Sequence, residues 1–380
     1  MTESTTLLLY CTIIIVSFFL ASLSQNRKYI ANGEVQVGTN KLLFLSSFLI
    51  PWFFFAFAGM SNDYAEYQHI FNVVTWDNFY RIWIEPGYAL LNLLIKTAIN
   101  DSVVGIVIIK SIIMVLVYKT IYDYRNKIPV GLAVLGFLCY CYLDAFCMIR
   151  INLAAAIVLF AFSRFDLKNA TKEAVILLVI AFFIHYSTFI VAIAVFGYIF
   201  CTRKKRISLN AYLVMVACLL VCRLVAIPLM NLLFKYIPVL AKYGEKYDTI
   251  SRSGSGLLQY IIHIPLLFVF HQSIRSIVAF QATDHNIYTI GMILAPFSLF
   301  FGTMGYSVQV IGRSFVFFLY LWIITVPCFY RTRCNQKVSD KSLVYLLIII
   351  WLVMKFVIYL QSDSLVSSGI AKYYFIWQVM

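Results

Sequence analysis

Asp144-Ala-Phe-Cys-Met-Ile-Arg150 opens the stretch that decides the fold, and His185-Tyr186-Ser187 closes it. Two apolar runs lie between these motifs, and a basic linker, residues 164–172, separates the two runs. Arg150 and His185 therefore each stand between apolar segments with almost no polar spacer. The pattern predicts two helical hairpins in a bilayer, with a cation and an imidazole at their tight turns. Because an ionisable group there is costly unless it faces the bundle interior or a wet cavity, both residues are functional candidates.

The composition of the whole chain is typical of a membrane protein. Of its 380 residues, 62% are hydrophobic and 12% are charged, and apolar runs of near-bilayer length recur from end to end. Only helices and closed barrels satisfy their backbone hydrogen bonds in lipid, and the sequence lacks the short alternating strands of a barrel. The sequence therefore predicts an all-α polytopic membrane protein that forms a single integral membrane domain over residues 1–380.

The apolar runs predict about 12 transmembrane helices. A further run, residues 86–99, is short for a span and fits a re-entrant or half-depth helix with Pro86 in its first turn. The first run lacks a basic segment before it and a clear cleavage site, so we expect a retained span rather than a signal peptide. The expected spans are about 7–24, 42–59, 103–118, 130–148, 151–162, 174–184, 188–201, 209–229, 257–270, 287–304, 314–330 and 343–360.

Lysine and arginine orient these spans, because cytoplasmic loops carry an excess of positive charge. Of the 30 such residues, 18 fall in alternate loops, which are therefore predicted to be cytoplasmic. Two long polar loops, residues 60–102 and 228–256, then lie outside, as do the turns at Arg150, His185 and Arg313. We expect chemistry or binding at the external face. The cytoplasmic loops are residues 25–41, 119–128, 164–172, 202–206, 273–286 and 330–341.

Charge and cysteine content exclude several function classes. The net charge of +14 follows the predicted topology and forms no single basic face with interleaved aromatic residues, so it does not indicate nucleic-acid binding. The nine cysteines lie mostly inside apolar runs without a CxxC pair, which favours small buried hydrophobic residues over a disulfide framework or a metal site. No motif has metal-ligand spacing or the glycines of a phosphate-binding loop.

Three arginines are candidate ligands for a diphosphate. Arg150 and Arg313 are isolated at predicted external turns, and Arg81 lies in the first long loop beside Glu85. A planar guanidinium binds phosphate oxygens through two parallel hydrogen bonds and stays charged when it is desolvated. The alternative is an interfacial arginine that snorkels to the headgroups or pairs with Asp144.

Candidate acid–base groups lie nearby in the sequence. His185 could serve as a general base or donate a hydrogen bond to a sugar or a phosphate, and the alternative is a structural histidine bonded to a carbonyl. Glu85 immediately precedes Pro86-Gly87-Tyr88, where a helix-capping role and a substrate-facing carboxylate are equally good interpretations. Lys96 could help Arg81 to bind anions.

Carboxylates and tyrosines alternate just after the second span. If residues 63–67 are helical, Asp63 and Glu66 share one face and Tyr64 and Tyr67 another, because helical neighbours are three residues apart. Together with Tyr88, these side chains suit sugar binding through hydrogen bonds and ring stacking. Acids at a helix N-terminus and an interfacial tyrosine belt would produce the same pattern.

These residues resemble the EpsG-type branch of bacterial polysaccharide polymerases, which is related to the Wzy-type O-antigen polymerases. The resemblance extends over roughly residues 60–330. Its motifs, in order along the chain, are Asp63-Tyr64-x-x-Tyr67, Glu85-Pro86-Gly87-Tyr88, Arg150-x-x-Leu153-Ala154, Ile184-His185-Tyr186-Ser187 and, more weakly, Arg313-Ser-Phe-Val-Phe-Phe.

The resemblance implies a membrane glycosyltransferase of the C-type superfamily at the external or periplasmic face of a bacterial inner membrane. It would transfer the glycan from one undecaprenyl diphosphate to the non-reducing end of another lipid-linked repeat unit. Arg150 and Arg313 would hold the diphosphate, and His185, Asp63 or Glu85 would activate the acceptor hydroxyl. Neither a cofactor nor a metal is expected. Expected partners are the lipid-linked oligosaccharide, membrane lipid, and a chain-length regulator and flippase.

Three other interpretations stay open from the sequence. A flippase or transporter of lipid-linked glycan would need a polar path to both faces, for which Lys110, Arg223 and Lys355 are the main candidates. An acyltransferase that modifies surface glycan could use His185 but would need a second acid–base group at fixed spacing. The third interpretation is a non-enzymatic assembly partner. Sugar identity, linkage and the class of surface polysaccharide are not encoded in any recognisable motif.

Overall fold

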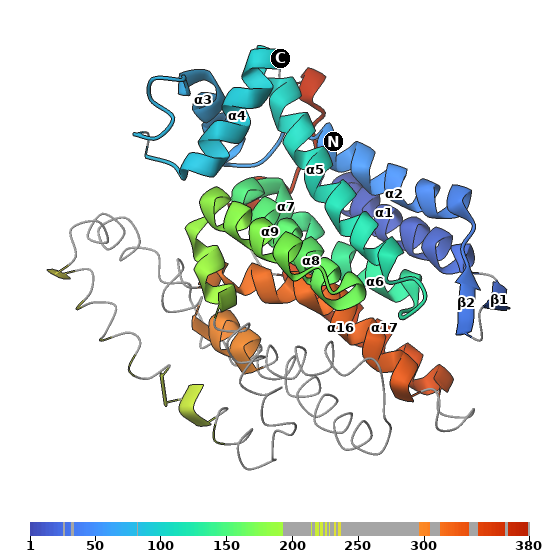
Figure 1. Cartoon of the computed structure of the whole chain (residues 1–380). Helices are drawn as coiled ribbons and strands as arrows, with labels where there is room; N and C mark the ends of the chain where they lie inside the picture. The colour runs from blue at the N-terminus through green and yellow to red at the C-terminus, as the bar shows by residue number, and fades with distance from the viewer. Residues whose placement is uncertain are drawn as a thin grey trace. The chain divides into compact units, whose positions relative to one another are not determined.

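A computed structural model describes residues 1–25, 27–31, 34–81, 83–192, 296–304, 312–333, 341–361 and 364–378, with scattered residues between 214 and 236. The chain forms two compact units, Met1–Phe189 with Tyr320–Met380, and Ile190–Leu319. Most of the second long loop, residues 228–256, and most residues of the predicted spans 188–201, 209–229 and 257–270, with the first half of 287–304, therefore lie outside the described residues. The fold of the first unit positions the candidate site (Figure 1).

The first unit is almost entirely helical, and its helices follow the apolar runs. Where the sequence predicts a half-depth helix over residues 86–99, the structure has α4, Pro86–Ala98, with proline at its first position. The other helices are α1 Glu3–Ser24, α2 Lys41–Ala56, α3 Tyr64–Val73, α5 Ser102–Asp123, α6 Val130–Tyr140, α7 Tyr142–Cys147, α8 Ile149–Lys168, α9 Thr171–Ile184, α16 Phe315–Arg333, α17 Lys341–Gln361 and α18 Ser364–Ser367, with 3-10 turns η1 Tyr186–Thr188 and η2 Ile376–Gln378.

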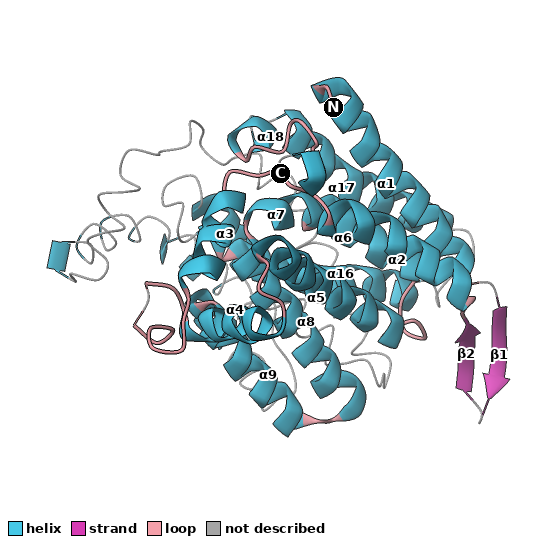
Figure 2. Cartoon of the chain, turned by 90° about the horizontal axis from the view of Figure 1, so that it is seen from above, coloured by secondary structure: helices cyan, strands magenta, loops and turns pink. Residues whose placement is uncertain are grey.

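The described residues are helical as predicted, apart from one short β-hairpin that was not predicted. Strands β1, Arg27–Ala31, and β2, Glu34–Gly38, pair antiparallel with Arg27 opposite Gly38, and they extend the connection between α1 and α2 (Figure 2). The signal was present in the sequence, because Asn32-Gly33 is the residue pair that two-residue hairpin loops favour most strongly. Because long apolar runs flank it, this polar segment is predicted from the sequence only as a loop.

The predicted break before Arg150 is confirmed, and the predicted linker after it is wrong. Helix α7 ends at Cys147 and α8 begins at Ile149, so Arg150 lies in the first turn of a new helix. The basic segment 164–172 does not form an extended linker, because α8 continues through Lys168. Only two residues make the turn to α9, and the first, Asn169, adopts the left-handed conformation that asparagine tolerates well (φ 50°).

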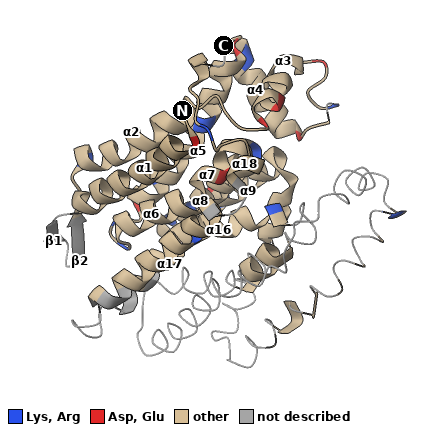
Figure 3. Cartoon of the chain, turned by 180° about the vertical axis from the view of Figure 1, so that it is seen from behind, with Lys and Arg blue, Asp and Glu red and all other residues tan. Residues whose placement is uncertain are grey.

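The membrane character is supported by helix length and composition. Among the described residues, α1 and α5 have 22 residues each and are long and apolar enough to cross a bilayer. Four shorter apolar helical segments accompany them, and most of the helical ribbon is made of residues other than Lys, Arg, Asp and Glu (Figure 3). The count of about 12 spans and the C-type glycosyltransferase fold stay predictions. The four segments are Lys41–Ala56, Val130–Tyr140, Phe315–Cys328 and Tyr345–Leu360.

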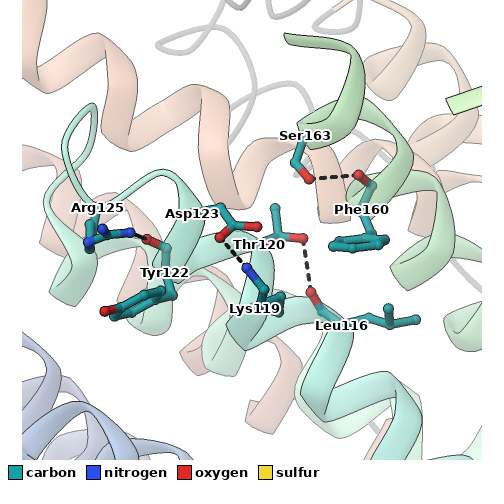
Figure 4. A network of polar contacts seen from close by, with 8 residues as sticks. All are labelled: Leu116, Lys119, Thr120, Tyr122, Asp123, Arg125, Phe160 and Ser163. Carbon is teal, nitrogen blue, oxygen red and sulfur yellow. Dashed lines mark hydrogen bonds and ion pairs between the residues drawn. The ribbon is translucent and has the colours of Figure 1, made fainter. Parts of the chain in front are cut away.

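Three loops that were predicted to be cytoplasmic meet at one end of the first unit. The side-chain amide of Gln25 donates to the carbonyls of Arg125 (2.8 Å) and Ile128 (2.9 Å). The Tyr124 hydroxyl donates to Asp166 at 3.0 Å, so the end of α8 joins the same group. Nearby, local contacts engage the basic residues: Lys119 pairs with Asp123, and Arg125 stacks on the Tyr122 ring at 4.2 Å (Figure 4).

Both chain termini lie at the opposite end of the first unit, beside the other ends of α1, α2, α5 and α17 (Figure 1). The C-terminal strap, defined here as residues 364–378, pairs with the connection 57–62 that leads from α2 to α3. Gly59 N–H donates to the carbonyl of Tyr374 at 2.9 Å, and Ile376 N–H donates to that of Phe57 at 3.0 Å. A Cβ on Gly59 would stand 2.8 Å from the Cα of Ile376, so only glycine permits this approach. The strap therefore holds the connection that leads into α3.

Candidate functional site

Helix α3 separates its acids from its tyrosines. Tyr64 and Tyr67 are buried, with 7% and 5% of their surface exposed, whereas Asp63 and Glu66 are exposed. Burial raises the pKa of Tyr64 and of Tyr67 to about 12. The predicted division into two faces is therefore present, with the aromatic face turned into the protein.

Glu85 and Arg150 form the central ion pair of the site. Nη1 of Arg150 lies 2.7 Å from Oε2 of Glu85, and the two side chains are 25% and 12% exposed. Glu85 precedes α4 but makes no capping hydrogen bond to it, so the capping interpretation gives way to the ion pair. Among the described residues the carboxylate that Arg150 meets is Glu85, not the Asp144 that its place in the sequence suggested.

Two tyrosines hold the guanidinium in place. Cζ of Arg150 lies 5.8 Å from the ring centre of Tyr88, which itself lies 6.2 Å from the ring centre of Tyr67. The Tyr67 phenol lies beside the Arg150 guanidinium and the backbone of Ile149 and Arg150, and these groups partly offset the effect of burial on its pKa. It therefore lies at the N-terminus of α8, where Met148 supplies no side-chain cap. The rings limit the motion of Arg150 without neutralising it.

His185 directly follows the last residue of α9, and one of its two imidazole nitrogens accepts a hydrogen bond from the protein. Its Nδ1 accepts a hydrogen bond from the amide of Ser187 at 3.2 Å, and its backbone carbonyl accepts from Thr188 N–H at 3.0 Å. A neutral imidazole that accepts at Nδ1 carries its proton on Nε2. Of the two roles that the sequence allowed, this geometry favours a hydrogen-bond donor over a general base.

Gly87 brings the ion pair and the end of α9 together. A Cβ at Gly87 would stand 2.7 Å from the backbone carbon of Phe183 and 2.8 Å from its carbonyl oxygen, so no larger residue fits without a shift of backbone. Phe183 lies two residues before His185, and Gly87 lies two residues after Glu85. The Glu85-Pro86-Gly87-Tyr88 motif is thus fixed between the start of α8 and the end of α9.

In the first unit, Arg81 and Lys96 have partners other than this ion pair. Arg81 is exposed and stacks on its neighbour Tyr80 at 5.0 Å. Arg313 is half-buried in the second unit, so its assignment to the same site stays a prediction. Lys96 serves as a cap, because its Nζ donates to the carbonyls of Asn72 (2.7 Å) and Val74 (3.1 Å) at the end of α3.

Two features near the site were missed in the sequence, the close approach of Gly87 and the buried Asn152, and Lys110 was considered there only for a polar path across the membrane. Gly87 was quoted within its motif, but its close approach to α9 has no local signal. Asn152 is fully buried on α8, and its Oδ1 has no hydrogen-bond partner among the described residues. Lys110 is fully buried on α5, and its Nζ donates to the Ala58 carbonyl at 2.9 Å. Its position within an apolar run was the available signal.

The site is built from nitrogen donors and one carboxylate. A guanidinium at a helix N-terminus, with an imidazole donor at the end of the adjacent helix, suits an anion with several oxygen atoms. Over the described parts of the chain, no group of three or more His, Cys, Asp or Glu side chains is placed to hold a metal ion. The arrangement can bind a phosphate and offers Glu85 as the acid–base group beside it.

Comparison with known proteins identifies the family. The family model described as the EpsG family matches residues 41–375, which include the described helices α2–α9 and α16–α18. No curated protein matches the chain, and no solved structure matches it. The matched range contains the Glu85–Arg150 pair and His185, as well as most of the C-terminal strap, up to residue 375, which the sequence resemblance had not included. The chain is therefore a membrane protein that belongs to the EpsG family.

Proposed function

We propose that this protein is a glycosyltransferase that polymerises lipid-linked polysaccharide repeat units. It transfers a glycan from undecaprenyl diphosphate to the non-reducing end of a second lipid-linked unit, and undecaprenyl diphosphate leaves. The reaction takes place at the external face of the bacterial inner membrane. Membership of the EpsG family supports polysaccharide synthesis, and the Glu85–Arg150 pair at 2.7 Å is the observation that carries the reaction type.

The proposed roles follow from the chemistry of each group. Arg150 binds the diphosphate of the donor, because a guanidinium can form two parallel hydrogen bonds to phosphate oxygens and remains charged in a partly dry site. Arg313 and Arg81 are proposed to assist it. In the transition state this fixed positive charge stabilises the negative charge that develops on the leaving diphosphate. His185 donates a hydrogen bond from Nε2 to a donor or acceptor oxygen.

Glu85 is proposed as the base that activates the acceptor hydroxyl. It is the carboxylate beside Arg150, whereas Asp63 is exposed at the start of α3 and stays an alternative. The predicted sugar-binding residues Tyr64, Glu66, Tyr67 and Tyr88 divide into two groups. Exposed Glu66 can reach a sugar hydroxyl directly. The buried rings of Tyr67 and Tyr88 lie beside Arg150, whereas the buried ring of Tyr64 lies beside Lys110. A chain-length regulator and a flippase are the proposed protein partners.

The test uses the purified full chain and one substrate, undecaprenyl diphosphate carrying a single repeat unit. Polymerase activity converts this unit into a ladder of longer lipid-linked glycans on a gel. Arg150→Gln should abolish the ladder, whereas Lys119→Gln, which removes a positive charge from the exposed pair of Figure 4, should leave it intact. A flippase would leave single units and move them between the leaflets of a vesicle. An acyltransferase would likewise leave the single units unextended in this assay.

A further inference from the structure

Arg150, which the proposed function assigns to the diphosphate, already has an anionic partner in the structure. The Arg150 guanidinium meets the Glu85 carboxylate at 2.7 Å, with one face on the Tyr88 ring and the Tyr67 phenol beside it. Building on the proposed function, we propose that Glu85 fills the diphosphate subsite while no donor is bound. The lipid diphosphate then displaces Glu85 from Arg150, and only the displaced carboxylate is available as the base for the acceptor hydroxyl.

Competition between the two anions follows from charge and geometry. A carboxylate and a diphosphate bind the same fork of guanidinium N–H groups, and both are negative, so they repel one another when they share one cation in a partly dry site. The start of α8 favours the diphosphate in this exchange. Its first amides carry the partial positive charge of a 20-residue helix, which attracts an anion of higher charge more strongly.

Those amides lie beside a neutral group in the present structure, the phenol of Tyr67. Phosphate oxygens are stronger hydrogen-bond acceptors than a phenol because they are charged. A diphosphate that replaces Glu85 on Arg150 can therefore also gain the amides at the start of α8 as partners.

The backbone around Glu85 lets the side chain move while its Cα stays in place. Pro86 fixes the start of α4, and Gly87 lies 2.7 Å (measured from an added Cβ) from the backbone of Phe183. No capping hydrogen bond ties the Glu85 carboxylate to α4, so rotation about its side-chain bonds is sufficient. A displaced carboxylate remains next to the end of α9, where an acceptor sugar can meet the His185 side of the site.

The transfer step balances without any further reactant. The acceptor hydroxyl oxygen attacks the anomeric carbon of the donor sugar, and its proton passes to the Glu85 carboxylate. The bond between the anomeric carbon and the diphosphate oxygen breaks, and undecaprenyl diphosphate leaves with the electron pair. When it departs, Glu85 gives its proton to water and pairs with Arg150 again. Masking the base until the donor is bound protects the enzyme from activating water or acceptor in a futile step.

The experiment measures binding of farnesyl diphosphate, a water-soluble polyprenyl diphosphate, to the full chain in detergent by calorimetry. Glu85→Gln removes the competing charge and keeps the shape, so it should tighten binding roughly tenfold relative to the natural protein. The same variant should slow ladder formation by about a hundredfold or more, because an amide cannot accept the proton. Asp77→Asn, which removes an equal charge from an exposed position in the same loop, is the matched control and should change neither value.

The outcomes separate this inference from the proposed function. The exchange is overturned if Glu85→Gln binds farnesyl diphosphate no more tightly than the natural protein does, while Arg150→Gln does not bind it. The proposed polymerase function stands in that case. Tighter binding with undiminished ladder formation overturns the role of Glu85 as base. If the natural protein neither binds the diphosphate nor extends the lipid-linked unit, the proposed function fails and the exchange falls with it. Should Glu85→Gln fold poorly in a thermal unfolding assay, Glu85→Asp gives the same directions with smaller changes.

Discussion

Arg150 and Lys110 are both cations among the apolar helices of the first unit, and their surroundings differ in kind. Arg150 is 25% exposed and its main partner is a carboxylate side chain. Lys110 is fully buried, and its ammonium donates to the Ala58 carbonyl and lies 5.4–5.9 Å from the ring centres of three aromatic residues. These residues are Phe55, Tyr64 and Phe146.

The difference indicates which cation acts on a substrate. A carboxylate side chain can rotate away and leave its arginine to another anion, whereas a backbone carbonyl and packed rings cannot be exchanged without unfolding the neighbourhood. The Lys110 ammonium is also surrounded by its carbonyl and ring partners, so it is not available to contact a ligand. We therefore assign Arg150 to the chemistry and Lys110 to the connection 57–62, which also carries the C-terminal strap.

The largest effect should come from Arg150→Lys. Lysine keeps the charge but loses the planar fork, and it cannot bind phosphate oxygens through two parallel hydrogen bonds. We expect ladder formation from lipid-linked repeat units to fall by about a hundredfold or more. Thermal unfolding in detergent should show little change, since Arg150 is partly exposed. A variant with normal ladders would remove Arg150 from the chemistry and end the contrast with Lys110.

Lys110→Met should give the opposite pattern. Methionine has similar length, but it leaves the Ala58 carbonyl without its donor, which costs about 1–3 kcal/mol in the free energy of unfolding. Loss of the buried charge offsets part of this cost. We expect a lower unfolding temperature with ladder formation reduced less than tenfold. Lost activity at unchanged stability would show that Lys110 acts on the substrate.

Gly369→Ala tests the strap that shares the 57–62 connection with Lys110. Gly369 has φ +71°, and an added Cβ would stand 2.4 Å from Oδ1 of Asn62. The strained backbone and the clash should destabilise the fold by about 1–2 kcal/mol. Gly136→Ala on α6 is the control: its Cβ would lie 3.7 Å from Leu352, in ordinary contact, and alanine favours a helix. Equal unfolding temperatures for the two variants would contradict a structural role for the strap.

Tyr67→Phe should have the smallest effect, about 1 kcal/mol, because it removes one phenol oxygen from the start of α8. The same variant also tests how the stability of the fold depends on pH. Burial raises the pKa of Tyr67 from its ordinary 10.0 to about 12, so the neutral phenol stabilises the fold below pH 10, and this contribution is lost as the pH rises toward 12. The phenylalanine variant should lose less stability over that interval in alkaline unfolding curves. Identical curves would mean that Tyr67 is not buried in solution.

The helical framework around the site was predictable in detail. The half-depth run 86–99, the break before Arg150 and the end of α9 at His185 each follow from local signals: a proline at a first turn and ionisable groups between apolar runs. The two faces of α3 follow from helical spacing alone. The hairpin of β1 and β2 had its own local signal, Asn32-Gly33, and was missed because the neighbouring spans dominated the interpretation.

The partners of the site residues could not be predicted in the same way. Asp144 lies six residues before Arg150 in the sequence and was the obvious candidate, yet the ion pair forms with Glu85, 65 residues away. The strap is more distant still: Gly59 meets Tyr374, and Asn62 meets Ser367 across 305 residues. Neither contact leaves a local pattern, because a single sequence records which groups are costly to bury but not which distant group satisfies them.

By itself, the sequence determined that this chain enters a membrane as helices, where those helices break, and that Arg150 and His185 stand at the breaks. Apolar run length and the cost of a buried charge are local properties, and both can be read from neighbouring residues. Only the tertiary structure decided that Glu85 neutralises Arg150, that Gly87 seats this pair against α9, and that the C-terminal strap holds α3. Helix packing chose these contacts, and packing depends on the shapes of surfaces that are far apart along the chain.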